Sequence, residues 1–181
     1  MAGPLKLGAQ ALAVMGVGIL ASLLGWNLTH QTPPPKVGAP APAFSLHRLT
    51  GDGDLSLRSF RGKTVVLNFF ASWCGPCKRE APELESVWRR YRSDGLVVLG
   101  VDSGDARGSA RSFLSAHGVT YPIVFDPGET MALGPYAVPG LPVTYVINPA
   151  GRIVGEPLLG PVSDSGYSQE FDRELKAALQ T

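Results

Sequence analysis

Two cysteines at the junction of an apolar strand and a predicted helix constrain this chain more than any other feature. They are Cys74 and Cys77, in the run WCGPC, and the 181-residue sequence contains no other cysteine. The preceding residues 64–70, TVVLNFF, are apolar and β-branched, which predicts a buried strand. Pro76 suits the first turn of a helix, because no backbone hydrogen bond is lost there. A thiolate at Cys74 would then be stabilised by the positive end of the helix.

Three other roles compete with a redox role for this cysteine pair. A zinc site needs two more ligands, and the histidines, His30, His47 and His117, have no ligand spacing. A structural disulfide across so small a loop would add little stability. A peroxidatic cysteine needs no partner two residues further on. The pattern therefore favours a redox-active disulfide between Cys74 and Cys77, with no metal and no other cofactor.

Residues 7–28, LGAQALAVMGVGILASLLGWNL, contain no charged side chain. A helix of this length spans about 33 Å, enough to cross the hydrocarbon core of a bilayer. We therefore predict a membrane anchor over residues 1–28, with a transmembrane helix at about 7–28. A cleaved signal peptide is the alternative, but no small-x-small site follows the apolar run. Lys6 and the amino terminus predict an N-inside orientation, which would place the rest of the chain in the periplasm or another extracytoplasmic space.

The chain after the anchor divides into a spacer and one domain. Five prolines in residues 29–43, THQTPPPKVGAPAPA, predict a semi-rigid polyproline spacer outside any core. Residues 44–181 have the size of a single domain. The whole chain carries 16 basic and 15 acidic residues, a net charge of +1. This balance gives no electrostatic footprint for nucleic acid.

Strand and helix patterns alternate through residues 44–181. Leucines on either side of a Gly-Asp-Gly-Asp turn at 51–54 predict a short β-hairpin. Further strands are predicted at 64–70, 96–101, 121–125, 143–147 and 152–154, helices at 76–92 and 106–117 and around 171–179, and a helical turn near 129–133. This alternation predicts an α/β fold with a partly parallel sheet.

The sequence around the cysteines, NFFASWCGPCKRE over residues 68–80, resembles the thioredoxin superfamily. More narrowly, it is similar to the membrane-anchored TlpA/ResA/CcmG-type thiol–disulfide oxidoreductases, together with VPGLP at 138–142, TYVI at 144–147 and GRIV at 151–154. The resemblance covers roughly residues 44–179. It implies a thioredoxin-like fold, a central mixed sheet flanked by helices, with an N-terminal β-hairpin and an inserted helix–strand unit before Pro142. It also implies that Pro142 is a cis proline facing the dithiol.

The resemblance implies an activity and partners. Family members of this kind reduce protein disulfides outside the cytoplasm, take electrons from a transmembrane thiol donor of the CcdA/DsbD kind, and serve cytochrome c maturation by reducing apocytochrome c. A general disulfide reductase, a disulfide donor and a non-catalytic peptide-binding module are the alternatives. Asn68, Gly75 and Val143 depart from residues typical of thioredoxin, ResA and CcmG respectively, so the resemblance does not choose a branch.

Each predicted site residue has a role. Cys74 attacks the substrate disulfide and Cys77 resolves the mixed disulfide. Trp73, directly before the nucleophile, is expected to shield the dithiol and touch substrate. By resemblance, Leu141 and Pro142 contact substrate as well.

The last predicted site residue, Glu80, follows from helical geometry. At about 100° per residue, it lies at the edge of the apolar stripe around Cys77, whereas every other charged residue of the helix falls on the opposite face. Glu80 is either a solvated edge residue or a desolvated acid with a raised pKa that shuttles the proton of Cys77. The family places a functional acid at this position, which favours the second interpretation.

Overall fold

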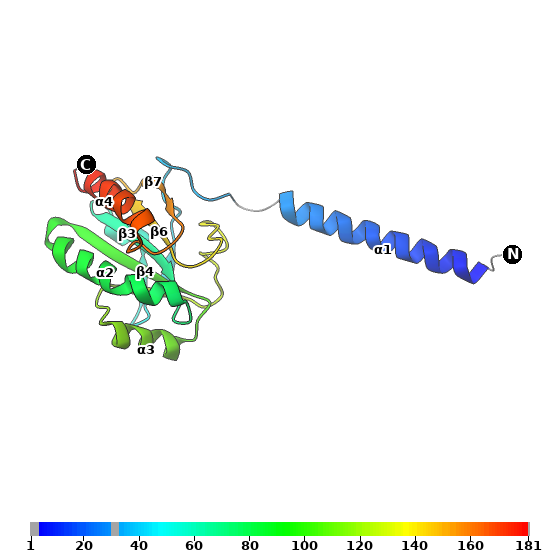
Figure 1. The fold of residues 1–181 in the computed structure, drawn as a ribbon, viewed down its shortest axis with the longest axis horizontal. Coiled ribbons are helices and arrows are strands. Elements are labelled where there is room, and N and C mark those ends of the chain that lie inside the picture. The colour runs from blue at the N-terminus through cyan, green and yellow to red at the C-terminus, as the bar shows by residue number, and fades with distance from the viewer. Residues whose placement is uncertain (1–3, 30–32, 181) are drawn as a thin grey trace. The chain divides into compact units, whose positions relative to one another are not determined.

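The computed structural model describes residues 4–29 and 33–180 and divides the chain into two compact units, residues 1–32 and 33–181. The first unit contains helix α1 (Pro4–Thr29; Figure 1). Its side chains described between residues 14 and 26 are all exposed. Within the described part of the chain, no helix combines the length and the apolar character needed to cross a bilayer. The predicted anchor stays a prediction.

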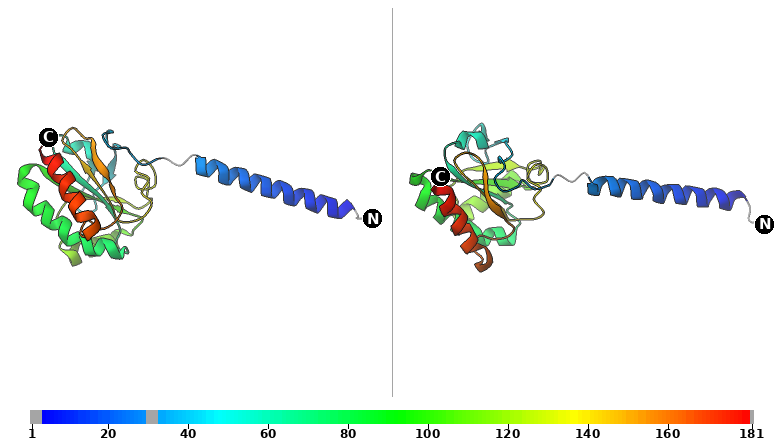
Figure 2. Two further views of the ribbon diagram at one scale, coloured as in Figure 1. Left: turned by 45° about the horizontal axis from the view of Figure 1, so that its top comes forward. Right: turned by 90° about the horizontal axis from the view of Figure 1, so that it is seen from above.

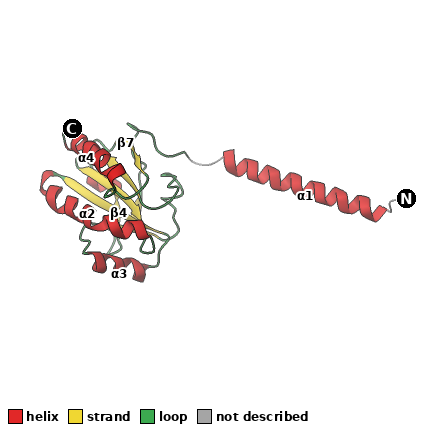
Figure 3. Ribbon diagram, viewed as in Figure 1, coloured by secondary structure: helices red, strands yellow, loops and turns green. Residues whose placement is uncertain are grey.

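The second unit is built on a mixed five-stranded sheet in the order β5-β4-β3-β6-β7. Figure 3 shows its strands in yellow beside the red helices. The strands β3 (Thr64–Phe70) and β4 (Leu96–Ser103) are buried at every position and pair in parallel, as β4 does with β5 (Ile123–Asp126). The strands β6 (Val143–Ile147) and β7 (Ile153–Leu158) complete the sheet in antiparallel pairs. Such near-continuous apolar runs are typical of central strands covered on both faces.

Helices cover one face of this sheet and loops cover the other. The helices α2 (Gly75–Tyr91), α3 (Arg107–His117) and α4 (Ser165–Leu179) pack their apolar sides into one core cluster (Figure 2). The opposite cluster is formed with residues of strand β2 (Asp54–Ser56), the 3₁₀ helix η1 (Leu57–Phe60) and the segment 131–138. The thioredoxin-like α/β fold with a central mixed sheet is therefore confirmed.

Most predicted elements occur close to their predicted bounds. The expected hairpin is the antiparallel pair of β1 (Ser45–His47) and β2 (Asp54–Ser56). The strand predicted at 152–154 is longer than expected, because β7 continues through Gly155, at φ 72°, and past a register shift opposite β6. The sequence did not predict this extension, because glutamate and proline are depleted in strands and proline is confined to edge strands. A second 3₁₀ turn, η2 (Arg92–Asp94), links α2 to β4.

The end of the predicted spacer lies on the domain. Of residues 29–43, positions 30–32 lie outside the described residues, and the second unit begins at Pro33. The backbones of Gly38, Ala39 and Ala41 exchange hydrogen bonds of 2.9–3.0 Å with Gly151 and Ile153, beside β7. Between the prolines these residues keep the N–H groups that an open sheet edge can pair with. The domain therefore starts earlier than the predicted residue 44.

Candidate functional site

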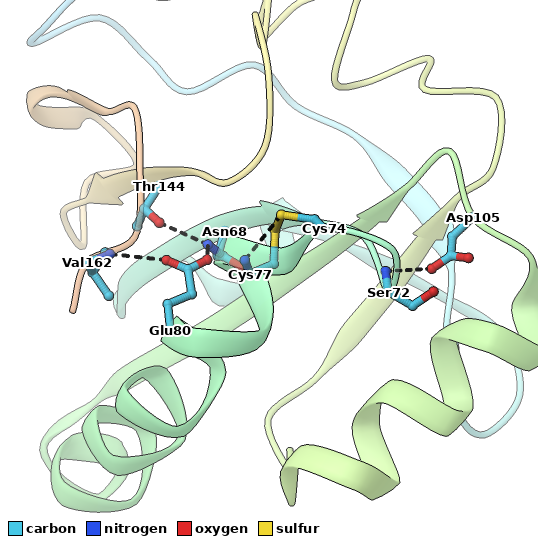
Figure 4. Close-up of a disulfide and its surroundings, with 8 residues drawn as sticks. All are labelled: Asn68, Ser72, Cys74, Cys77, Glu80, Asp105, Thr144 and Val162. Atoms are coloured by element: carbon cyan, nitrogen blue, oxygen red, sulfur yellow. Dashed lines mark hydrogen bonds between the residues drawn. A yellow bond between two sulfur atoms is a disulfide. The ribbon is translucent and has the colours of Figure 1, made fainter. Parts of the chain in front are cut away.

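The cysteine pair lies where β3 gives way to α2, at the carboxyl end of the parallel strands. Cys74 and Cys77 form a disulfide, with their Cα atoms 5.3 Å apart (Figure 4). Cys74 is the N-cap residue of α2, and its Sγ accepts a hydrogen bond from the Cys77 N–H at 3.2 Å. The first turn of α2 carries no acidic residue, so nothing there offsets the positive end of the helix dipole. Reduction would release a Cys74 thiolate into this stabilising field.

Glu80 lies in the interior, one helical turn after Cys77, and is 1 % exposed. Its Oε1 accepts a hydrogen bond from Asn68 Nδ2 at 2.8 Å, and its Oε2 accepts one from the Val162 N–H at 3.1 Å (Figure 4). Asn68 also donates to Thr144 Oγ1 at 2.9 Å. The carboxyl group is thus held by α2, β3, β6 and the loop before α4. Sequence reasoning noted Asn68 only as a departure from thioredoxin and missed it as the partner of Glu80.

Burial raises the pKa of Glu80 to about 7, although the hydrogen bonds from Asn68 and Val162 oppose this shift. Of the two interpretations of Glu80, the structure shows the desolvated acid; its role in proton transfer stays a prediction. Glu85, which the helical angle placed on the polar face, is also buried, at 7 % exposure. Its carboxylate accepts hydrogen bonds from the Thr120 N–H and hydroxyl at 2.7 and 2.6 Å, and the Thr120 segment covers it.

The peptide bond between Leu141 and Pro142 is cis, as the resemblance implied. Pro142 directly precedes β6, where Val143 pairs with Phe69 at the end of β3 from which the cysteine loop departs. Pro142 is buried and Leu141 is half-buried. Together with Leu159, which sequence reasoning missed and which is 53 % exposed, they line a shallow pocket.

Trp73 is 61 % exposed, so it is not part of the core. Its Nε1–H donates a hydrogen bond to the Gly104 carbonyl at 3.2 Å, which ties the indole to the loop after β4. The neighbouring Ser72 N–H donates to Asp105 Oδ2 at 2.7 Å. Neither Gly104 nor Asp105 was expected at the site from sequence. Within the described residues, no group of three or more potential ligands could hold a metal ion.

A thioredoxin-like sheet with a cysteine pair at the start of a helix defines the class of thioredoxin-like proteins, and the comparisons with known proteins agree with this class. Residues 37–155 match the AhpC/TSA family, and the chain belongs to this family. It is 35 % identical over 117 residues to the thiol-disulfide oxidoreductase ResA of Bacillus subtilis, a match that covers 65 % of this chain and 64 % of that protein. The matched region is thus just under two thirds of that relative's length.

Two further proteins are similar over more of their length. The thioredoxin-like protein YneN of Bacillus subtilis is 33 % identical over 161 residues, which cover 85 % of this chain and 92 % of YneN. The crystal structure of a thiol:disulfide interchange protein of the thioredoxin family from Chlorobium tepidum TLS is 28 % identical, with a TM-score of 0.66. That match covers 82 % of this chain and 98 % of the other. These similarities support a thiol–disulfide oxidoreductase activity for the Cys74–Cys77 pair.

Proposed function

We propose that this protein is an extracytoplasmic, membrane-anchored thiol–disulfide oxidoreductase that reduces disulfides in protein substrates. The observation that carries the proposal is the single site where Cys74 caps α2, Cys77 lies one turn on, and Glu80 is buried one turn further. A purely structural disulfide needs neither a helix N-terminus nor a buried acid. A peptide-binding module would likewise have no use for Cys77.

In the proposed mechanism, the Cys74 thiolate attacks a substrate disulfide and forms a mixed disulfide, while the other substrate sulfur leaves as a thiolate. Cys77 then attacks the Cys74 sulfur, which restores the Cys74–Cys77 disulfide and releases the second substrate thiolate. Glu80 takes up the proton that Cys77 loses in this second step. A buried acid whose pKa is about 7 is suited to accept and return a proton near neutral pH.

Trp73, Leu141 and Pro142 are the proposed substrate contacts. The exposed indole of Trp73 and the pocket lined by Leu141 and Pro142 offer apolar surface near the carboxyl end of β3. A protein substrate can bury such surface, whereas a small disulfide cannot. We therefore expect extended segments around a substrate disulfide to bind here.

The proposed membrane anchor supports an extracytoplasmic site of action. Its basis is the uncharged run of residues 7–28, which lies within α1, and the exposed large apolar side chains described on that helix between residues 14 and 26. Outside the cytoplasm no glutathione or thioredoxin pool reduces the dithiol. The proposal therefore includes a transmembrane thiol donor of the CcdA/DsbD kind. Apocytochrome c, whose Cys-x-x-Cys-His needs reduced thiols before haem attachment, is the proposed substrate.

A disulfide donor is the second candidate, because the same dithiol chemistry runs in either direction. The reduction potential separates the two, and an equilibrium titration of the full chain against glutathione measures it. We expect a potential more reducing than that of the glutathione couple, as for a thioredoxin-type dithiol. A strongly oxidising value would refute the reductase and favour the donor.

A further inference from the structure

The loop after β4 holds the segment that carries the nucleophile through two hydrogen bonds. The Asp105 carboxylate accepts the Ser72 N–H at 2.7 Å, and the Gly104 carbonyl accepts the Trp73 indole N–H at 3.2 Å. Asp105 also accepts the N–H of Ala106, immediately before α3, at 2.8 Å. One carboxylate therefore joins the start of α3 to Ser72, two residues before Cys74. Figure 4 shows the bond between Ser72 and Asp105.

A second carboxyl group lies beneath this loop. Asp102, three residues before Asp105, is fully buried, and neither of its oxygens has a hydrogen-bond partner among the described residues. It is in register with Phe70 of β3 on one side and Phe125 of β5 on the other, so its neighbours in the sheet are apolar. A buried carboxylate without a partner is costly, whereas the neutral acid is much less so.

The charges around Asp102 are mostly negative. Asp105 is the nearest acid, and burial together with this neighbour raises the pKa of Asp102 to about 8. Arg107 at the start of α3 opposes the shift, but its guanidinium donates to the carbonyls of Arg48 and Leu49.

Two further acids come from the segment after β5. Asp126 is buried and accepts three backbone N–H groups, those of residues 130–132. The side chain of Glu129 lies against Gly104. Asp126 is in register with Ser103, so its side chain lies on the other face of the sheet from Asp102.

We infer that Asp102 and Asp105 form a carboxyl pair that positions Cys74: the Asp105 carboxyl group holds the backbone of Ser72, and a neutral Asp102 beneath the loop lets it stay there. When Asp102 loses its proton to solvent, two carboxylates face each other and Asp105 is displaced from the Ser72 N–H. The indole of Trp73 then loses its fixed place beside Cys74. The pair lies on the α3 side of the cysteines, in contacts separate from those of Glu80.

This inference rests on the proposed role of Cys74 as nucleophile, but its first test needs no activity. In the oxidised full chain neither cysteine titrates, so a fluorescence change of Trp73 between pH 6 and 10 reports the carboxyl groups. The Trp73 signal is obtained as the difference from Trp73→Phe, since Trp26 and Trp88 also emit. We expect a transition near pH 8 that persists in Glu80→Gln and disappears in Asp102→Asn.

The matched control is Asp172→Asn, an exposed acid on α4, which should keep the transition. Asp105→Asn should abolish it, because an amide does not repel an ionised Asp102. A transition retained in Asp102→Asn, or absent from the parent chain, would overturn the inference. Either result would leave the proposed reductase function standing, since no turnover is measured.

A second test measures positioning directly, as the rate at which reduced protein attacks a small aromatic disulfide at pH 7. Asp105→Ala should lower this rate about tenfold, the effect of losing one charge-assisted hydrogen bond. Asp105→Asn should recover most of the loss, because its amide oxygen can accept the Ser72 N–H. Equal losses in both variants, or no loss in Asp105→Ala, would refute a positioning role.

Discussion

Replacing Glu80 by glutamine removes the one titrating group buried beside Cys77 and nearly preserves its shape. The new side-chain amide would keep an oxygen to accept the hydrogen bond from Asn68 Nδ2 but would turn an amide N–H toward the Val162 N–H, where the carboxylate accepted 3.1 Å away. Loss of that acceptor costs about 1 kcal/mol at every pH. The pH-dependent part of the free energy of unfolding, by contrast, belongs to the ionisation of Glu80.

The sign and size of the pH-dependent part follow from the thermodynamic linkage between folding and proton binding. The pKa of Glu80 is about 7 in the folded chain, against an ordinary value of 4.5, so between these values the folded state binds more protons than the unfolded state. The free energy of unfolding of the parent therefore falls as pH rises through this window. With these two pKa values, the contribution of Glu80 drops by roughly 2–3 kcal/mol between pH 5 and pH 8.

The assay is guanidinium unfolding of the oxidised full chain at pH 5, 6, 7 and 8, followed by near-UV circular dichroism. The quantity compared is the free energy of unfolding of Glu80→Gln minus that of the parent, in which contributions from Asp102 and Glu174 cancel. We expect this difference to rise by roughly 2–3 kcal/mol from pH 5 to pH 8. Glu83→Gln, an exposed acid on the same helix, should give a flat difference. A flat difference for Glu80→Gln would show that Glu80 ionises normally and would refute the reasoning.

Three further predictions concern the reaction and the anchor. Cys77→Ser should trap substrates as mixed disulfides through Cys74, while Cys74→Ser should trap none; pull-downs with the reverse pattern would exchange the two roles. Glu80→Gln should slow resolution of the mixed disulfide near pH 7 in stopped-flow assays, and unchanged turnover would leave Glu80 without a catalytic role. The full chain should sediment with membranes, and a reporter that works only outside the cytoplasm should be active when fused after Thr181. Release of the protein as a shortened soluble chain would indicate a cleaved signal.

The fold was predictable because its central strands carry an unusually plain pattern. TVVLNFF and LVVLGV are apolar at nearly every position, which is typical of a strand covered on both faces. The edge of the sheet was less predictable. The strand β7 contains Gly155, Glu156 and Pro157, and the segment at 38–41 pairs through its backbone alone, so neither carries a side-chain signal of pairing.

The candidate site, like the fold, has one part that could be predicted from the sequence and one part that could not. The local contacts of Cys74 and Cys77 follow from one helical turn, and the position of Glu80 relative to them follows from the helical angle. Its partners do not, because Asn68 and Val162 lie 12 and 82 residues away along the chain, and Thr144 in turn accepts a hydrogen bond from Asn68. One available signal was missed. An aspartate at the end of an apolar strand, in LVVLGVDS, is a costly residue to bury and marks position 102.

Glu80 and Asp102 are both buried acids, and they meet different demands. Glu80 is held by two hydrogen bonds and contacts the α4 side of the sheet, where a proton can be taken up as Cys77 becomes a nucleophile. Asp102 has no hydrogen-bond partner among the described residues and lies under the loop that orients the residues before Cys74. Both pKa values are raised mainly by burial, to about 7 and about 8, so the site holds two neutral acids at slightly acid pH. Raising the pH would add negative charge first at Glu80 and then at Asp102. Alkaline conditions should thus oppose the thiolate from two directions, through charge repulsion near Cys77 and through a loosened segment before Cys74.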